Sequence, residues 1–395
     1  MHYFIVWCFL AIPCFITMKA HKSSLSRVLF LIVYLAVALT SGLRYETGTD
    51  YFAYSGIYSD IYPLHTAIDR GQLFPIMTLI EPGYLFICSL FAMLGLSVNI
   101  MFLAISLTTT ALLLNSIKNY IPKYFNFGVL SYFCFIFFLL DMSGVRQAIA
   151  LNLFIFSIRY ILDKRIFRFL FVISLAIVFH YTAAILIFFY PLYNMRFSKH
   201  TMITIIIISF CIFVFRFPLI SILFDILGKT FNNELLTSKL LNYTTNEFLT
   251  KSRVLSPLMV IYIPIFIIAV LWQENLSKIT PYYNILLNIF MLFIVSVFIL
   301  YESEDISVRV STYFMIGFCL LLPLTLELIK IGTSRTIMAT CILMLSLYSI
   351  RHMIYGDQIS SILFRPYQNF LFIEAGIQDS DAQQRKDIFI NNFGD

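Results

Sequence analysis

Charged residues are scarce in this sequence. Only 12% of the 395 residues are charged and 60% are hydrophobic, whereas soluble domains carry about 25% charged residues. This composition excludes an ordinary soluble domain. It predicts a polytopic membrane protein embedded in a lipid bilayer.

Patterns for metals, disulfides and nucleotides are also missing. The seven cysteines lie inside or at the ends of apolar runs, and no two of them form a CxxC pair, so we predict no disulfide framework and no cysteine metal site. The sequence has no P-loop, no dinucleotide fingerprint, no HExxH and no GxSxG. We therefore expect no cofactor.

The net charge of +6 does not indicate a nucleic-acid partner. The positive residues are dispersed in short loops between apolar segments, where Lys and Arg set the orientation of a membrane protein. The first apolar run, residues 3–18, lacks a basic leading region and a small-residue cleavage site. We therefore treat it as a retained span and not as a signal peptide.

Long apolar runs are the main feature that is present. A helix rises 1.5 Å per residue, so crossing about 30 Å of hydrocarbon takes roughly 20 residues. Ten runs approach this length: residues 2–18, 25–43, 98–117, 126–141, 146–162, 201–217, 254–272, 281–300, 310–329 and 335–350. Residues 83–96 are too short to cross, and residues 167–193 are too long for one span and short for two.

The distribution of basic residues predicts the orientation. Of the 27 Lys and Arg residues, 14 fall in six short loops, which the positive-inside rule makes cytoplasmic. The loops then alternate between the two sides of the membrane only if residues 83–96 do not cross the membrane and residues 167–193 cross it twice. We predict an all-α fold of about twelve transmembrane helices plus one re-entrant or interfacial helix, with both termini outside.

The domain organisation follows from the same map. No linker or repeat divides the chain, so we expect a single integral membrane domain over residues 1–395. Its expected polar parts are external loops at residues 44–81 and 218–252 and a polar C-terminal tail at residues 352–395.

Three arginines stand at the ends of expected spans on the external side. Arg44 ends one span, while Arg146 and Arg309 open two others. A guanidinium binds phosphate oxygens in bidentate geometry and keeps its charge when partly desolvated, so we predict that the three bind a diphosphate. The alternative is that each reaches lipid headgroups or pairs with a nearby carboxylate.

Two residues are candidates for a general base. His180 lies between two short helical half-spans, residues 167–179 and 181–193, so it would lie on the floor of a cavity open to the outside. Asp50 lies in the polar stretch after the second span. Imidazole titrates near neutral pH, and a carboxylate can also accept a hydroxyl proton. The alternatives are a core histidine bonded to a backbone carbonyl, and a turn residue that caps its own loop.

Two further groups of side chains stand in the same expected external face. The tyrosines of the polar stretch, including Tyr51 and Tyr54, suit either a membrane interface or the stacking of sugar rings. Glu302, Glu304 and Asp305 could coordinate a divalent cation, but such a cluster is more typical of a solvated loop. We predict no metal site.

Four stretches, taken in order, resemble one family. They read Arg44-x3-Gly48-Thr49-Asp50-Tyr51-x2-Tyr54, then Glu81-Pro82-Gly83-Tyr84, then Arg146-Gln147-x-Ile149-Ala150, then Ala176-x2-Phe179-His180-x-Thr182-Ala183. The ordered set, over about residues 30–195, resembles the EpsG-like branch of the Wzy-type polysaccharide polymerases. Such enzymes are similar to other multi-span glycosyltransferases of the GT-C type.

The resemblance implies a function. Enzymes of this kind transfer a growing oligosaccharide from undecaprenyl diphosphate to a hydroxyl of the next lipid-linked repeat unit, at the periplasmic face of the bacterial inner membrane. The product would be an O antigen or an exopolysaccharide, and a chain-length co-polymerase would be a partner. On this reading His180 or Asp50 is the base, the three arginines hold the diphosphate, and Tyr51, Tyr54, Gln147 and Glu81 contact the sugar.

Other functions stay open at this point. A flippase for lipid-linked sugar would need charged groups along a path on both sides, whereas the polar residues here favour one face. A second alternative is an O-antigen ligase, which moves finished glycan onto lipid A core, or an acyltransferase that decorates sugars.

Overall fold

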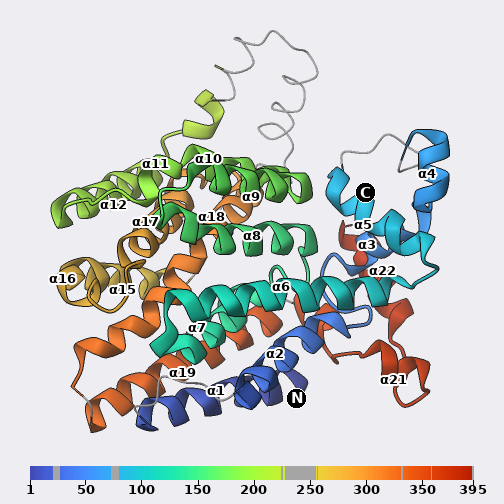
Figure 1. The fold of residues 1–395 in the computed structure, drawn as a ribbon, viewed down its shortest axis with the longest axis horizontal. Helices are drawn as coiled ribbons and strands as arrows, with labels where there is room; N and C mark the ends of the chain where they lie inside the picture. The colour runs from blue at the N-terminus through green and yellow to red at the C-terminus, as the bar shows by residue number, and fades with distance from the viewer. Residues whose placement is uncertain are drawn as a thin grey trace. The chain divides into compact units, whose positions relative to one another are not determined.

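The computed structural model describes residues 1–20, 27–72, 80–223, 226, 255, 257–330, 332–356 and 358–393. The regular secondary structure of these residues is helical, and no strand occurs among them; Arg44 and Asn369 form an isolated antiparallel bridge. The prediction of an all-α fold is confirmed for this part of the chain. The chain forms two compact units, which are described separately below (Figure 1).

The first unit comprises Met1–Tyr160, Arg165–Ala184 and Lys330–Asp395. Its helical elements are α1 (His2–Ala20), α2 (Arg27–Gly42), α3 (Tyr51–Asp60), α4 (Leu64–Arg70), α5 (Pro82–Met93), α6 (Val98–Tyr120), η1 (Pro122–Tyr124), α7 (Phe125–Tyr132), η2 (Phe133–Phe137), α8 (Val145–Leu162), α9 (Ile166–Phe179), η3 (Tyr181–Ala184), α19 (Thr333–Tyr355), α20 (Gln358–Phe364), α21 (Phe370–Glu374) and α22 (Ala382–Phe393).

The second unit comprises Ile161–Lys164 and Ile185–Ile329. Its elements are α10 (Ile185–Phe188), α11 (Tyr190–Tyr193), α12 (Lys199–Val214), α15 (Met259–Leu271), α16 (Gln273–Leu276), α17 (Tyr283–Ile299), α18 (Glu304–Leu321) and η4 (Leu322–Leu328). Helices α17 and α18 pack side by side and form its centre. Serine side chains at positions 198 and 303 cap α12 and α18 by accepting a backbone N–H of the first turn.

Four helical stretches are long and apolar enough to cross a membrane: Val98–Tyr120, Val145–Leu162, Glu304–Leu328 and Thr333–Tyr355. Each coincides with a span expected from the sequence. Seven shorter apolar helices accompany them in the described residues. These apolar helices indicate that the chain is a multi-pass membrane protein.

Several expected segments take a different local form. The run at residues 83–96 becomes α5, whose twelve residues rise about 18 Å, too little for a crossing. Residues 167–179 form a short helix as predicted, but residues 181–193 were wrongly expected to be a second one. They form η3, α10 and α11, and Pro191 stands at the start of the last of these, where the missing N–H of proline is tolerated.

The predicted external loops are only partly described. Residues 44–72 contain α3 and α4 and are therefore helical in part. Residues 73–79, and residues 224–225 and 227–252 of the second loop, lie outside the described residues.

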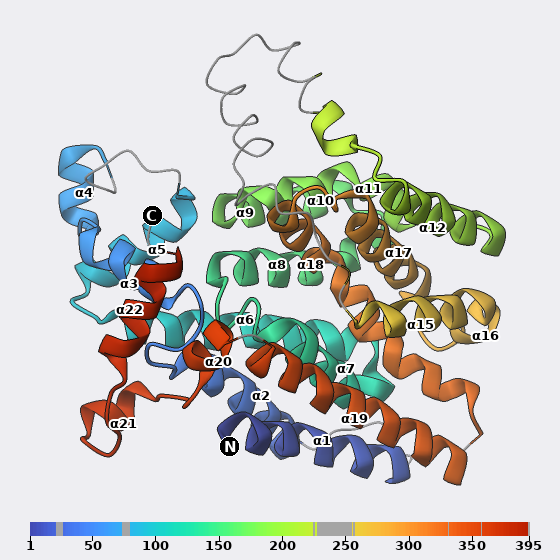
Figure 2. The same cartoon turned by 180° about the vertical axis from the view of Figure 1, so that it is seen from behind.

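The C-terminal tail folds back onto the polar stretch that follows α2. Tyr45 N–H donates to the carbonyl of Gln368 at 2.9 Å, and Gly48 N–H donates to that of Leu363 at 3.1 Å. Figure 2 shows α22 beside α3, where Phe389 packs on Phe52. The tail is therefore part of the first unit and holds the motif loop, residues 43–50, from one side.

Arg385 of α22 anchors this contact. Its side chain is 1% exposed. It donates to the Glu46 carbonyl at 2.8 Å, to the Thr47 hydroxyl at 2.9 Å and to the Pro366 carbonyl. Charge-assisted hydrogen bonds of this kind are stronger than neutral ones, so one guanidinium joins two segments that are distant in sequence.

Arg385→Ala should lower the free energy of unfolding by about 2–4 kcal/mol, because it leaves three buried acceptors without donors. Thermal unfolding in detergent measures the effect. Lys386→Ala is the control, since Lys386 is an exposed neighbour on the same helix. Equal melting temperatures for the two variants would contradict the anchoring role.

Candidate functional site

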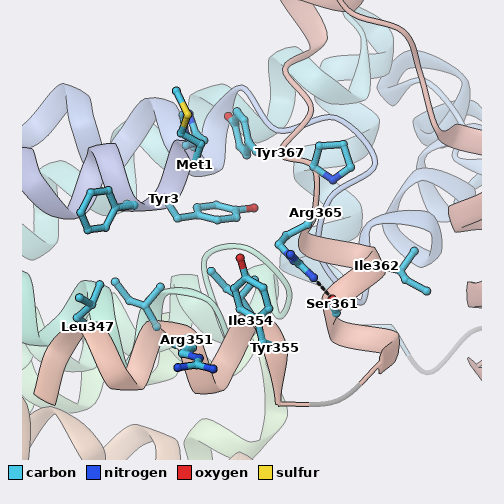
Figure 3. Close-up of a pocket in the computed structure, with 14 residues that line it drawn as sticks. Met1, Tyr3, Leu347, Arg351, Ile354, Tyr355, Ser361, Ile362, Arg365 and Tyr367 are labelled. Carbon is cyan, nitrogen blue, oxygen red and sulfur yellow. Dashed lines mark hydrogen bonds between the residues drawn. The ribbon is translucent and has the colours of Figure 1, made fainter. Parts of the chain in front are cut away.

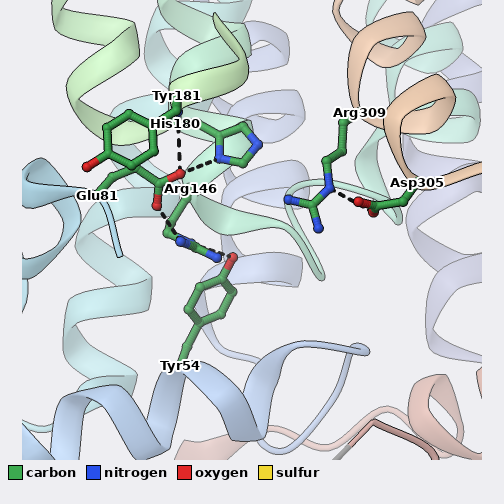
Figure 4. A network of polar contacts seen from close by, with 7 residues as sticks. All are labelled: Tyr54, Glu81, Arg146, His180, Tyr181, Asp305 and Arg309. Atoms are coloured by element: carbon green, nitrogen blue, oxygen red, sulfur yellow. Dashed lines mark hydrogen bonds and ion pairs between the residues drawn. The ribbon is translucent and has the colours of Figure 1, made fainter. Parts of the chain in front are cut away.

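A carboxylate at the start of α5 joins two other helices of the first unit. Glu81 precedes α5, and its carboxylate accepts hydrogen bonds from the guanidinium of Arg146 on α8 and from Nδ1 of His180 after α9 (Figure 4). The His180 contact is 2.9 Å, and the backbone N–H of Tyr181 lies 3.4 Å from the same oxygen. Residues 81, 146 and 180 are the Glu81 cluster.

Local sequence explains why these three segments meet. Pro82 begins α5 at the position where a helix tolerates proline. Gly83 then lies directly against α9: a Cβ at this position would be 2.8 Å from the carbonyl oxygen of Val178. His180 ends α9 in an extended conformation, which turns its ring out of the helix and toward Glu81. The Glu-Pro-Gly and Phe-His patterns therefore encode one packed junction.

Arg146 is the accessible member of the cluster. Its side chain is 24% exposed, whereas the side chains of Glu81 and His180 are 5% and 7% exposed. Its guanidinium carbon lies 5.6 Å from the centre of the Tyr54 ring, and Nε lies 3.5 Å from the Tyr54 hydroxyl. The cluster thus has a buried anion and a cation that solvent or a ligand can reach.

The electrostatics of Glu81 keep it ionised. Burial by itself would raise the pKa of this carboxyl, but the hydrogen bond from His180 and the charge of Arg146 outweigh burial and lower the pKa to about 2. Glu81 is therefore a carboxylate at any physiological pH.

An ionised carboxylate can only accept hydrogen bonds, and this assigns the histidine tautomer. The hydrogen of His180 must lie on Nδ1, so Nε2 of the neutral ring carries the free electron pair. Nε2 is buried and has no hydrogen-bond partner among the described residues. The arrangement can accept one proton at a defined nitrogen, next to a guanidinium that can bind an anion.

The tyrosines of the polar stretch lie in the core beside the cluster. Tyr51 and Tyr54 are 3% and 2% exposed. The Tyr51 hydroxyl donates to the side-chain oxygen of Asn99 at 2.7 Å. Gln147 follows Arg146 on α8 and is also buried. Of these residues, Tyr54 contacts Arg146 directly.

Asp50 is the last residue of the motif loop, and Arg44 lies near its beginning. Asp50 precedes α3 and accepts a hydrogen bond from the Thr49 hydroxyl at 2.8 Å. Gly48 has φ of +106°, and a Cβ there would be 1.9 Å from the Met142 carbonyl oxygen. Only glycine allows the loop this approach to the turn before α8.

Arg44 is buried below this loop. It is 1% exposed, donates through Nη1 to the Ser41 carbonyl at 2.5 Å, and lies 4.6 Å from the centre of the Phe102 ring. Its Nε and Nη2 have no hydrogen-bond partner in the described part of the chain. Arg44 and Asp141 both line one small cavity. The Tyr132 hydroxyl donates a hydrogen bond to the Asp141 carboxylate at 2.7 Å.

Arg309 belongs to the second unit. Its Nε donates to Asp305 one turn earlier on α18 at 2.8 Å, as Figure 4 also shows. The neighbouring Glu302 accepts from the backbone N–H of Ile220 at 2.6 Å and from the hydroxyl of Ser221 at 2.6 Å. The acidic group therefore has local partners within its own unit.

Direct contacts bring together Glu81, Arg146, His180 and Tyr54 from the residues that the sequence singled out. The sequence did not indicate Arg385, which stands in a polar tail with no motif around it, or the backbone N–H of Tyr181. No local pattern marks either of them, because their partners lie 339 and 100 residues away in the chain.

Gly83→Ala should destabilise the protein by about 1–3 kcal/mol, because the new methyl group forces α5 away from α9. Gly56→Ala is the matched control: Gly56 lies within α3 and has nothing within 4 Å of its Cβ position. It should be neutral or slightly stabilising, since alanine favours a helix. Thermal unfolding of both variants in detergent measures the difference, and equal stability would contradict the close packing.

Glu81→Gln should lower the free energy of unfolding by about 3 kcal/mol at neutral pH, because one pKa unit corresponds to about 1.4 kcal/mol. A carboxyl whose pKa is lowered by folding stabilises the protein above its unfolded pKa of about 4.3. This stabilisation is lost as the pH falls toward 2. The gap in stability between wild type and variant should therefore stay constant from pH 8 to pH 5 and shrink below about pH 4. A difference in stability between wild type and variant that stays constant down to pH 3 would argue against a lowered pKa of Glu81.

Neither the curated proteins nor the solved structures gave a match. The sequence profile of the family described as "EpsG family" matches residues 27–369, which contain the Glu81 cluster, the motif loop and the whole of the second unit. At the general level, this family is one of glycosyltransferase-like polymerases of polysaccharide biosynthesis. The chain belongs to the EpsG family.

Proposed function

We propose that this protein is a polysaccharide polymerase. It transfers a growing oligosaccharide from undecaprenyl diphosphate to a hydroxyl of the next lipid-linked repeat unit, in the biosynthesis of an O antigen or an exopolysaccharide. The observation that carries the proposal is the Glu81 cluster, in which one carboxylate holds an accessible guanidinium and an imidazole with a defined tautomer. Membership of the family supports the class of reaction.

The topology is part of the proposal. We place the protein in the bacterial inner membrane as a single integral domain of GT-C type, with about twelve crossings and α5 as the re-entrant or interfacial helix. The concentration of Lys and Arg in six short loops supports an orientation in which the Glu81 cluster faces the periplasm.

His180 acts as the general base in this scheme. Its Nε2 takes the proton of the acceptor hydroxyl as the oxygen attacks the anomeric carbon of the donor sugar. Glu81, which we first expected to contact sugar, instead fixes the ring through Nδ1 and stabilises the imidazolium that forms. Nε2 is buried, so the acceptor reaches it only when neighbouring side chains make room.

Arg146 binds the donor diphosphate. As the bond between the anomeric carbon and the diphosphate oxygen breaks, negative charge grows on the leaving group, and a guanidinium already held in place stabilises it. The imidazolium forms at the same time on the other partner of Glu81. The proton and the negative charge thus appear beside groups of opposite charge, and the leaving diphosphate needs no acid.

Other residues of the motifs support this centre. The ring of Tyr54 packs against the guanidinium of Arg146. Tyr51 and Gln147 shape the wall of the proposed site. Asp50 and Arg44 fix the motif loop from within. Arg309 pairs with Asp305 in the second unit, and we assign it no step.

The partners follow from the reaction. The substrates are undecaprenyl-diphosphate-linked oligosaccharides in the bilayer, and a chain-length co-polymerase would set the product size. The proposed scheme uses no cofactor and no metal ion.

His180→Gln and Arg146→Lys should each lower the rate of chain extension by about 10²–10³-fold, because a general base and an electrostatic contact contribute about this much. Lysine keeps the charge of Arg146 but loses the bidentate geometry. Glu81→Asp should retain more activity than Glu81→Gln, and the loss in both should fall on kcat more than on KM. Purified protein with synthetic lipid-diphosphate repeat units shows extension as a ladder of products.

Arg168→Gln is the control, since Arg168 is an exposed arginine at the other end of α9. The assay also separates the rival functions: one added acceptor indicates a ligase, a new ester indicates an acyltransferase, and movement of lipid without a new bond indicates a flippase. A full ladder from His180→Gln would remove this residue from the reaction.

A further inference from the structure

An open cavity of about 790 Å³ lies in the first unit, away from the residues of the Glu81 cluster. Its lining comes from the start of α1, the second half of α19, α20 and the turn that follows α20 (Figure 3). No residue of the cluster lines it, and neither do Tyr45, Tyr51 and Tyr54. The reaction proposed above therefore makes no use of this space.

Two guanidinium groups provide the charge of the cavity. Arg351 projects from α19, and Arg365 reaches from the turn toward Ser361, as Figure 3 shows. Both side chains are exposed. Arg365 donates to the Ser361 hydroxyl, and its guanidinium carbon lies 3.7 Å from the centre of the Tyr355 ring. Among the residues that the structure describes, neither arginine forms an ion pair with a carboxylate, and none of those that line the cavity is acidic.

The remaining wall is apolar and continues onto exposed apolar helix faces. Phe4 and Leu347 line the cavity from α1 and α19. Phe4 is 52% exposed, and Met344 and Tyr348 on α19 are 63% and 48% exposed. Helix α19 is long and apolar enough to cross a membrane. A ligand in the cavity thus meets two guanidinium groups and an apolar wall that continues onto exposed apolar helix faces.

We propose that this cavity binds a lipid whose headgroup carries a phosphate or diphosphate. The guanidinium groups of Arg351 and Arg365 bind the phosphate oxygens, and stacking on Tyr355 orients Arg365. The hydrocarbon chain leaves along the apolar faces of α1 and α19. A free phosphate ion would share the charge contacts, but it would gain nothing from the apolar wall.

The site does not depend on the polymerase reaction, because any phosphate-bearing lipid has the required chemistry. Its test therefore uses binding and not activity. The probe is fluorescent phosphatidic acid in mixed micelles with the purified full-length protein, with phosphatidylcholine as the neutral probe and inorganic diphosphate as the soluble competitor.

Arg351→Gln/Arg365→Gln should weaken the binding of phosphatidic acid by tenfold or more, and Arg351→Gln alone by about threefold to tenfold. The single variant keeps the test sound if loss of the Arg365 stacking disturbs the turn. The matched control is Arg70→Gln. Arg70 is also exposed and stacks on a tyrosine, Tyr62, at 4.6 Å, but it does not line the cavity. It should bind as the wild type does.

Four results would overturn the proposal. Unchanged binding in the double variant would remove the cavity as the site, and an equal loss in Arg70→Gln would indicate general surface charge. Displacement of the lipid by stoichiometric inorganic diphosphate, or equal binding of phosphatidylcholine, would assign the site to a free anion or to the apolar wall alone.

Discussion

The buried carboxylate of Glu81 is the interaction on which the first unit depends most. A buried charge is costly unless it is paired and hydrogen-bonded, and Glu81 finds its partners on two other helices, at Arg146 and His180. Removing Arg146 leaves the anion without a cationic partner, and removing His180 takes away one of its hydrogen bonds. The starts of α5 and α8 and the end of α9 are therefore held in one arrangement by a single side chain.

This interaction is supported by close backbone packing. Gly83 lets α5 approach α9, and Gly48 lets the motif loop approach the turn before α8. From the other side, Arg385 and the residues around the cis peptide bond before Pro366 hold the loop through hydrogen bonds. The motif residues are thus rigid because segments from both ends of the chain enclose them, as a preorganised site requires.

In the mechanism that we propose, a base and an anion site share one anchor. A charge that develops on His180 is stabilised there by the same carboxylate that positions Arg146. The two functions are coupled, because a change at Glu81 alters both partners at once. The cavity at Arg351 and Arg365 has no such carboxylate among the described residues that line it.

Composition and the length of the apolar runs determined that the chain is helical and made for a membrane, because hydrophobicity over about 20 residues is a local property. Short motifs identified Glu81, Arg146 and His180, since breakers such as Glu-Pro-Gly fix helix ends locally. Their meeting was decided only by the tertiary structure: pairing across 65 and 99 residues depends on how helices pack. The same holds for Arg44: the sequence predicts it at a helix end, but only the packing shows that it is buried. It also holds for Arg385, because no residue near it in the sequence indicates its three hydrogen-bond partners.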